Sequence, residues 1–201
     1  MRVGWSTIGP MTEFALKEWG VTCEALGAGD QVLVVRKGGI GEKRFDLPHP
    51  RFFLMPTYLH QRPELVKPGF HARYAASLDH REEPAHLPLT LYAELRSSYA
   101  LRDDEALAAI DAEHTLTPDY AAERLKWRRK HPLWAAVLRV WRLDSPPVLD
   151  VQPEHGGCVS WIALPDGIVA GARTPVLDDD AFAAADARIR DALAPFPAGV
   201  V

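Results

Sequence analysis

The sequence predicts a single α+β domain with a mixed or antiparallel sheet of about five strands flanked by helices. Its 201 residues are enough for one well-formed core. Its content of 47% apolar and 25% charged residues is ordinary for a globular protein. The predicted strands cluster along the chain instead of alternating strictly with helices, which favours α+β over a doubly wound sheet. We expect a flexible arm over residues 1–11, the domain over residues 12–195 and a frayed tail over residues 196–201.

The N-terminal quarter of the chain predicts a helix and two strands. Thr12 can cap a helix, and apolar residues follow it at near-helical spacing, so we predict a helix over residues 12–26 that Gly27 ends. A β-branched run predicts a strand over residues 31–37. A second short strand, over residues 51–55, lies between two prolines.

The middle of the chain is less regular. Residues 57–67 predict a short helix in which Pro63 marks a start or a break. Residues 69–88 are rich in His, Arg, Glu and Pro, which indicates a long surface connection. Residues 89–96 alternate between apolar and polar side chains, as in a strand with one buried face.

The C-terminal half predicts three helices and two strands. Acidic residues in the first turn favour a helix over residues 103–113. Thr-Pro at its start favours a second helix over residues 117–130. Strands are predicted over residues 133–143 and 157–164, and an amphipathic helix over residues 178–193 closes the fold.

Charge and cysteine content narrow the function classes. The net charge of −4 argues against a protein that is basic overall, but it leaves room for a local basic face. Two cysteines without CxxC spacing do not form a disulfide framework. The first eleven residues contain no apolar signal-peptide core, and no apolar run is long enough to cross a bilayer. We therefore expect a cytoplasmic protein with no membrane partner.

Arg36-Lys37-Gly38-Gly39 is the first segment whose residues suggest chemistry. Glycines let a backbone approach a phosphate closely, and the two cations suit an anionic ligand. Adjacent strand residues point to opposite faces, so only Arg36 or Lys37 can join a given pocket. The alternative is a hairpin whose glycines make the turn and whose charges are solvated.

Pro56-Thr57-Tyr58-Leu59-His60-Gln61 is the second such segment, and it directly follows a predicted strand. His60 is the catalytic candidate, because an imidazole can act as a general base, a phosphate partner or a metal ligand. Thr57, Tyr58 and Gln61 are candidate ligand-binding residues. The alternative has Thr57 capping a helix, with Tyr58 and His60 packed and hydrogen-bonded.

The basic helix near residue 124 is the third candidate segment. Arg124 and Arg128 are four residues apart and share a helix face, with Trp127 beside them. This combination suits phosphates and bases. A solvated face with one packed Trp is the alternative. Cys158 and Ser160 are a weaker nucleophile candidate, for which a buried structural thiol is the favoured interpretation.

Metal and cofactor binding find little support in the sequence. The eight histidines are scattered, without the spacing of a zinc-binding helix motif. The Gly-rich segment lacks the GxxxxGK[ST] spacing of a P-loop. We therefore expect no metal site and no cofactor.

Several of these segments together resemble a known bacterial family. The segments are ALKEW (residues 15–19), RKGGI (36–40), PTYLHQ (56–61), RLKW (124–127) and GCVSW (157–161). They resemble the family called domain of unknown function 1802, over about residues 12–164. The resemblance implies no defined activity. It implies a link to DNA restriction–modification, because some members of that family are fused to a restriction-enzyme subunit domain.

Three functions are compatible with these observations. The favoured one is a nucleic-acid-associated binding protein that takes nucleic acid or another phosphate-bearing ligand. The second is a hydrolase or phosphodiesterase that uses His60 with Arg36 or Lys37. The third is a structural or partner-binding protein without a catalytic site. The sequence leaves open whether the protein is an enzyme.

Overall fold

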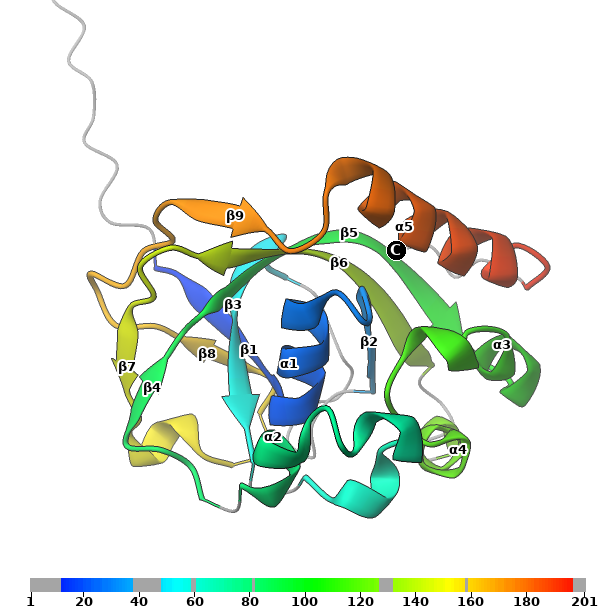
Figure 1. Ribbon diagram of the computed structural model, residues 1–201, viewed down its shortest axis with the longest axis horizontal. Coiled ribbons are helices and arrows are strands. Elements are labelled where there is room, and N and C mark those ends of the chain that lie inside the picture. The colour runs from blue at the N-terminus through cyan, green and yellow to red at the C-terminus, as the bar shows by residue number, and fades with distance from the viewer. Residues whose placement is uncertain are drawn as a thin grey trace, which may run out of the picture.

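The computed structural model confirms a single α+β domain built on one mixed sheet of seven strands (Figure 1). It describes residues 12–37, 48–58, 61–80, 82–126, 132–157 and 159–196. The main sheet has the order β2-β6-β5-β3-β1-β8, with β9 paired to β6, and β4 and β7 form a separate ladder. The strands are β1 (Phe14–Trp19), β2 (Leu33–Arg36), β3 (Arg51–Thr57), β4 (His86–Pro88), β5 (Leu91–Leu101), β6 (Leu133–Leu143), β7 (Val148–Asp150), β8 (Trp161–Ala163) and β9 (Arg173–Pro175).

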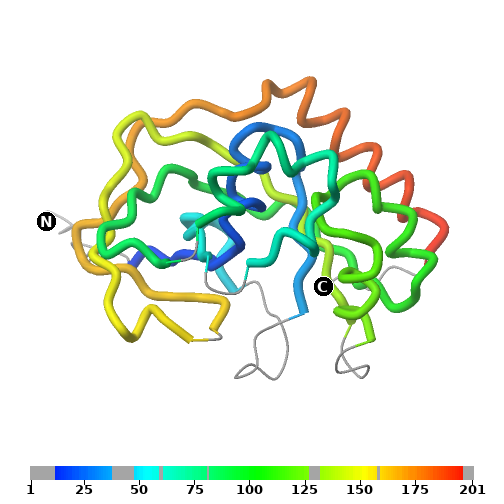
Figure 2. The backbone as a smooth tube through the Cα atoms, turned by 60° about the horizontal axis from the view of Figure 1, so that its bottom comes forward, coloured from blue at the N-terminus to red at the C-terminus, as the bar shows by residue number. Residues whose placement is uncertain are grey.

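The helices lie around this sheet. They are α1 (Gly20–Ala28), α2 (Ala75–Asp79), α3 (Asp104–Ala109), α4 (Pro118–Lys126) and α5 (Asp179–Leu193), with 3-10 turns η1 (Pro63–Leu65), η2 (Pro68–Phe70), η3 (Asp111–Glu113) and η4 (Pro153–His155). In Figure 2, α3 and α4, in green, lie at the same end of the molecule as α5, in red. In the described part of the chain, no helix is both long and apolar enough to span a membrane.

Side-chain caps explain where three helices begin, and for α4 the cap is Thr117, whose Oγ1 accepts from the backbone N–H of Tyr120 at 3.4 Å. The carboxylate of Asp103 accepts a hydrogen bond from the backbone N–H of Ala106 at 2.8 Å. Asp178 does the same for Ala181 at 2.7 Å. These bonds satisfy N–H groups that have no partner within the helix. The predicted starts of α3, α4 and α5 are thereby confirmed.

The sheet is mixed because β1 runs parallel to β3, whereas the other paired strands are antiparallel. The longest ladder joins β5 to β6, from Leu91 opposite Arg142 to Leu101 opposite Leu133. A register shift after Leu95 interrupts this ladder, as at a β-bulge. Bulges bend a strand and increase its twist, which favours a curved sheet.

The sheet curls until its two ends are close. β2 is the first strand in the order and β8 the last. The Arg36 side chain on β2 nevertheless hydrogen-bonds to Lys17 on β1 and to Ser160, which precedes β8. Helix α1 packs on the concave side, where its Cys23 and Leu26 join one buried cluster with side chains of β1, β2, β3, β5 and β6.

The prediction of a helix over residues 12–26 is wrong in its first half. Residues 14–19 form β1, between β3 and β8, and α1 begins only at Gly20. Ala15 and Leu16 are both fully buried, so the two faces of this strand are covered. A short apolar run of this kind has no period that separates a strand from a helix, and pairing in the sheet decides.

Other element boundaries also differ from the prediction. Among the described residues of the predicted helix 57–67, only η1 is helical, and Pro63 is its first residue. The predicted connection over residues 69–88 contains η2, α2 and β4. The strand predicted over residues 89–96 extends to Leu101, and its neighbouring residues 91–93 are all buried, so it is not half-buried there.

Candidate functional site

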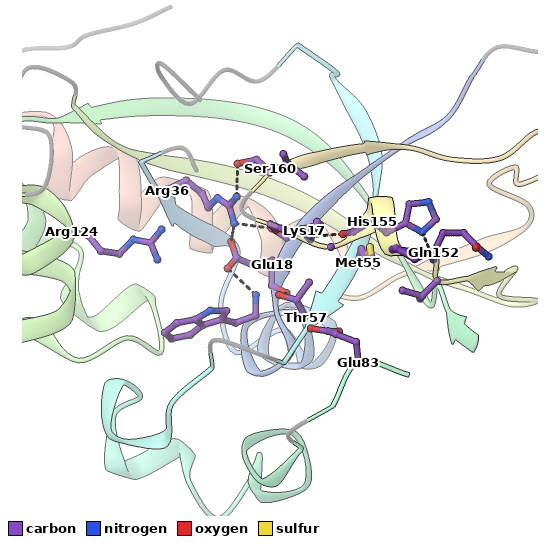
Figure 3. A pocket seen from close by; sticks show the side chains of 16 residues that line it. Lys17, Glu18, Arg36, Met55, Thr57, Glu83, Arg124, Gln152, His155 and Ser160 are labelled. Carbon is purple, nitrogen blue, oxygen red and sulfur yellow. Dashed lines mark hydrogen bonds and ion pairs between the residues drawn. The ribbon is translucent and has the colours of Figure 1, made fainter. Parts of the chain in front are cut away.

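A pocket of about 430 Å³ opens where the ends of β1, β2 and β3 meet the segment of residues 151–160 (Figure 3). Helix α4 and Glu83 complete its wall. Its described lining comprises Lys17, Glu18, Trp19, Arg36, Met55, Thr57, Glu83, Arg124, Val151, Gln152, Pro153, His155, Gly156, Gly157, Val159 and Ser160. The volume is in the range of pockets that hold small molecules.

Parallel pairing places one side of this pocket. Because β1 and β3 run in the same direction, their C-terminal ends lie at the same edge of the sheet, with Lys17 opposite Met55 and Trp19 opposite Thr57. Helix α1 starts directly after Trp19. The pocket therefore lies at a strand-to-helix junction, a common position for ligands.

Arg36 holds the two ends of the curled sheet together. Its Nη1 donates to the carbonyl of Lys17 at 2.7 Å and to Glu18 Oε2 at 3.0 Å. Its Nη2 donates to Ser160 Oγ at 2.7 Å. A planar guanidinium with fixed donors suits this three-way contact, and an ammonium group does not. Arg36 thus stabilises the fold through these bonds and also supplies a positive charge to the pocket.

The Glu18 carboxylate lies between two donors. Its Oε1 accepts from the backbone N–H of Trp19 at 2.9 Å, and its Oε2 pairs with Arg36. The side chains of Glu18 and Arg36 are only 10% and 12% exposed. A helix start and a guanidinium together form the environment that an anion prefers. Glu18 therefore acts as an anion that the protein itself supplies to the pocket.

Lys17 connects the strand ends to the opposite wall. Its Nζ donates to the carbonyls of His155 at 2.7 Å and Gly157 at 2.9 Å. Gly157 has a φ of 75°, a left-handed conformation that glycine adopts without strain. His155 Nδ1 accepts from the backbone N–H of Gln152 at 3.0 Å, so its neutral ring carries the proton on Nε2. These contacts hold residues 152–157 against the site.

An aromatic stack supports the wall next to α4. The Trp19 and Tyr120 rings are nearly parallel, at 8°, with centroids 5.2 Å apart. The Arg124 guanidinium carbon lies 5.4 Å from the Tyr120 ring centroid, and Arg124 Nη1 donates to the Tyr120 hydroxyl at 2.9 Å. Arg124 and Tyr120 are four residues apart on α4 and so share a helix face. This stack orients Arg124 along the pocket wall.

Three of the predicted ligand-binding residues line this pocket: Arg36, Thr57 and Arg124. The Thr57 hydroxyl donates to the carbonyl of Glu18 at 3.3 Å. Lys37 does not belong to the lining. It is buried, and its Nζ donates to the carbonyl of Leu125. Burial lowers the pKa of Lys37. Arg36 and Lys37 thus point to different places, as strand alternation requires.

Tyr58 and Gln61 pack against the start of α1 and are not part of the lining. Gln61 Oε1 accepts from the backbone N–H of Val21 at 2.8 Å, and its Nε2 donates to the carbonyl of Ser77 at 2.7 Å. A Cβ at Gly20 would lie 2.3 Å from the Tyr58 ring, so glycine is required there. Burial raises the pKa of Tyr58 to about 12.

Several predicted site residues lie outside the described part of the chain. They are Gly38, Gly39, His60, Trp127, Arg128 and Cys158. The hydrolase hypothesis depends on His60, so it stays a prediction. Among the described residues, no group of three or more His, Cys, Asp or Glu side chains is placed to hold a metal ion.

The sequence interpretation missed the β1 residues of the pocket, namely Lys17, Glu18 and Trp19. The reason is that this segment was interpreted as the start of a helix. It also missed Glu83, which comes from a connection between elements. A lysine and a glutamate within a strand that is otherwise buried would have been the signal, since buried charges need partners.

Comparisons with known proteins give one family and a few distant structures. The family model described as "Domain of unknown function (DUF1802)" matches residues 15–188. No curated protein matches the chain. The crystal structure of ASCH from Zymomonas mobilis is similar with a TM-score of 0.43 and 16% identity, over 77% of this chain and 88% of that one. A mutant of the same protein gives a TM-score of 0.44 and 15% identity, over 77% and 89%.

Proposed function

Since this chain belongs to the family of domain of unknown function 1802, whose description names no activity, we propose a function from its pocket. The protein is a nucleic-acid-associated binding protein, and the pocket formed by β1, β2, β3, α4 and residues 151–160 holds a phosphate-bearing part of the nucleic acid. The observation that carries this proposal is the presence of Lys17, Arg36 and Arg124 in one concave site.

The cations of the pocket support a phosphate ligand. Lys17, Arg36 and Arg124 come from β1, β2 and α4, which are distant in sequence. Phosphate contacts from Lys and Arg supply essentially all of the non-specific affinity of proteins for nucleic acid. The whole chain has a net charge of −4, so attraction for a phosphate must come from this local arrangement.

The aromatic part of the wall supports a ligand that also carries a base. Trp19 lines the pocket, and Tyr120 holds its indole from one side. Stacking of a base on an aromatic side chain contributes about 1–3 kcal/mol. A site that requires phosphate alone needs no such ring. A cation beside an aromatic ring suits single-stranded nucleic acid, whose bases are accessible.

Fluorescence anisotropy with labelled oligonucleotides tests the proposal. Single-stranded RNA, single-stranded DNA and duplex DNA are titrated at 50 and 200 mM salt. We expect a single strand to bind and its affinity to fall steeply with salt, because bound cations release counterions from phosphates. The three oligonucleotides distinguish RNA from DNA and single strand from duplex.

Two arginine variants connect any binding to the pocket. Arg124→Ala should weaken binding and reduce the slope of log affinity against log salt by about one. Arg190→Ala is the matched control, because Arg190 is exposed on α5 and pairs with Asp186 outside the pocket lining. The proposal is wrong if no oligonucleotide binds at low salt, or if both variants bind like the wild type.

A further inference from the structure

We infer that the pocket takes one nucleotide unit, consisting of one base and one phosphate, and not a run of stacked nucleotides. This inference rests on the proposed function and specifies its ligand. Three features of the described residues support it independently. They are the concave shape of the site, the single aromatic face it offers, and its charge.

The shape of the site suits one unit. Sites that follow a strand without selecting one nucleotide are positively charged grooves with several aromatic platforms in succession. Here a pocket of about 430 Å³ is closed on one side by strand ends and on the other by residues 151–160. Lys17 fastens these two walls together through the carbonyls of His155 and Gly157. A continuous nucleic-acid strand would have to pass between the two walls at the place where Lys17 joins them.

The aromatic surface has room for one base. Trp19 is the one Phe, Tyr or Trp among the described lining residues, and the residue that carries the other ring, His155, is buried. One face of its indole is stacked on Tyr120, with ring centroids 5.2 Å apart, so at most one face is open to a base. A base enters such a pocket only when it is unstacked from its neighbours, as at a strand end or when it is turned out of a strand.

The charge of the pocket suits one phosphate. Three cationic side chains and two carboxylates occur in the described lining, so its net charge is +1 with His155 neutral. The carboxylates are Glu18, which pairs with Arg36, and Glu83, which accepts from the backbone N–H of Tyr58 at 2.7 Å. One phosphate group, with about one negative charge as a diester and about two as a monoester, is close to balancing this site. A triphosphate brings more charge than the lining can balance.

The two ends of the pocket differ in chemistry. Figure 3 shows Arg124 at one end and Gln152 at the other. A guanidinium suits phosphate, and Trp19 contacts the same Tyr120 ring as Arg124, so the ring that can stack a base lies at the Arg124 end. A base and its phosphate can therefore occupy neighbouring positions at this end, as they do in one nucleotide unit.

Calorimetry and competition test the inference. Nucleoside 5′-monophosphates, the matching nucleosides, triphosphates and inorganic phosphate are titrated, and each is used to displace a bound oligonucleotide. We expect one monophosphate to bind per protein chain and to displace the oligonucleotide. The nucleoside and inorganic phosphate should each bind at least tenfold more weakly. The triphosphate should gain less than about threefold over the monophosphate.

Variants at Trp19 locate the base. Trp19→Ala should weaken binding of the monophosphate at least tenfold and binding of inorganic phosphate by less than about threefold, and Trp19→Phe should restore most of the monophosphate affinity because it keeps an aromatic face. Trp141→Phe is the control, because Trp141 lies on β6 beside Arg139 and Arg173, outside the pocket lining. Circular dichroism checks that each variant folds.

The outcomes separate this inference from the proposed function. If an oligonucleotide binds and no monophosphate displaces it, the inference is wrong and the proposed function stands. A triphosphate that binds tenfold more tightly, or inorganic phosphate that competes as well as a monophosphate, also overturns it. A monophosphate that binds in the pocket while no oligonucleotide binds supports the single-nucleotide site and overturns the proposed function.

Discussion

The side-chain oxygen of Gln61 accepts a hydrogen bond at 2.8 Å from the backbone N–H of Val21, forty residues earlier in the chain. Val21 is in the first turn of α1, where backbone N–H groups have no partner within the helix. The residue before α1 is Trp19, which makes no side-chain cap. Gln61 therefore does for α1 what Asp103 and Asp178 do for α3 and α5, but from a distant segment.

Replacing Gln61 should destabilise the protein. Gln61→Leu removes the acceptor for Val21 and the donor for Ser77, and both of these bonds are buried. We expect the free energy of unfolding to fall by about 2–4 kcal/mol, because two buried backbone groups lose partners. Arg62→Ala next to it is the control, since this exposed side chain pairs with Glu64 at 3.6 Å and should change stability by less than about 0.5 kcal/mol. Urea denaturation measures both, and equal stabilities would contradict the capping role.

The Glu18–Arg36 pair should show strong energetic coupling. Both side chains are largely buried, so removing one partner leaves the other charge without compensation. We expect Glu18→Gln and Arg36→Met each to cost about 2–4 kcal/mol, and the double variant to cost about 1–3 kcal/mol less than their sum. The Asp186–Arg190 pair on α5, at 3.6 Å and more exposed, should couple by less than about 0.5 kcal/mol. Similar coupling in the two cycles would show that burial does not strengthen the Glu18–Arg36 pair.

Glu18→Gln should also strengthen the binding of an anionic ligand. It removes a negative charge from the pocket and leaves Arg36 in place, so we expect roughly tenfold tighter binding of a single-stranded oligonucleotide at low salt. The same variant is less stable, and opposite signs for affinity and stability distinguish this effect from simple damage. Glu105→Gln on the exposed face of α3 is the control. Unchanged or weaker binding would mean that no phosphate comes near Glu18.

Buried His114 should make stability depend on pH. Burial, together with the positive charge of Lys67, lowers its pKa from 6.5 to about 4. In the unfolded chain His114 therefore binds a proton at a higher pH than in the folded protein. Stability should be constant above about pH 7 and fall by up to about 3 kcal/mol as pH drops from 6.5 to 4. Urea midpoints for the wild type and His114→Leu measure this, and the variant should show a shallower decline over that range.

Local signals in the sequence were enough for much of the fold. Asp103, Thr117 and Asp178 are caps that act within one turn, so the starts of α3, α4 and α5 could be predicted from a few residues. Strand β6 was predicted with its observed bounds, Leu133–Leu143, because it is a long β-branched and aromatic run. β1 could not be predicted in this way, because its partners β3 and β8 lie far along the chain.

The candidate site shows the same difference between what local sequence signals can predict and what depends on distant partners. Arg36, Thr57 and Arg124 were selected because they stand at strand ends or on a basic helix face, and they do line the pocket. Lys37 and Gln61 were selected for the same local reasons, and the fold uses them to bind buried backbone groups. No local sequence pattern distinguishes a residue that lines the pocket from one that binds a buried backbone group. The distinction depends on which distant carbonyl or N–H group lacks a partner, and that is a property of the assembled fold.

The position of β1 between β3 and β8 has a consequence for synthesis of the chain. The ribosome makes β1 (Phe14–Trp19) long before its antiparallel partner β8 (Trp161–Ala163), because the two strands are far apart along the chain. At about 5–20 residues per second, one edge of β1 waits roughly 7–30 s for its partner. An apolar strand with an open edge can pair with other chains during that time. Lys17 and Glu18 interrupt its apolar run, so the charges that build the pocket also protect the nascent strand from aggregation.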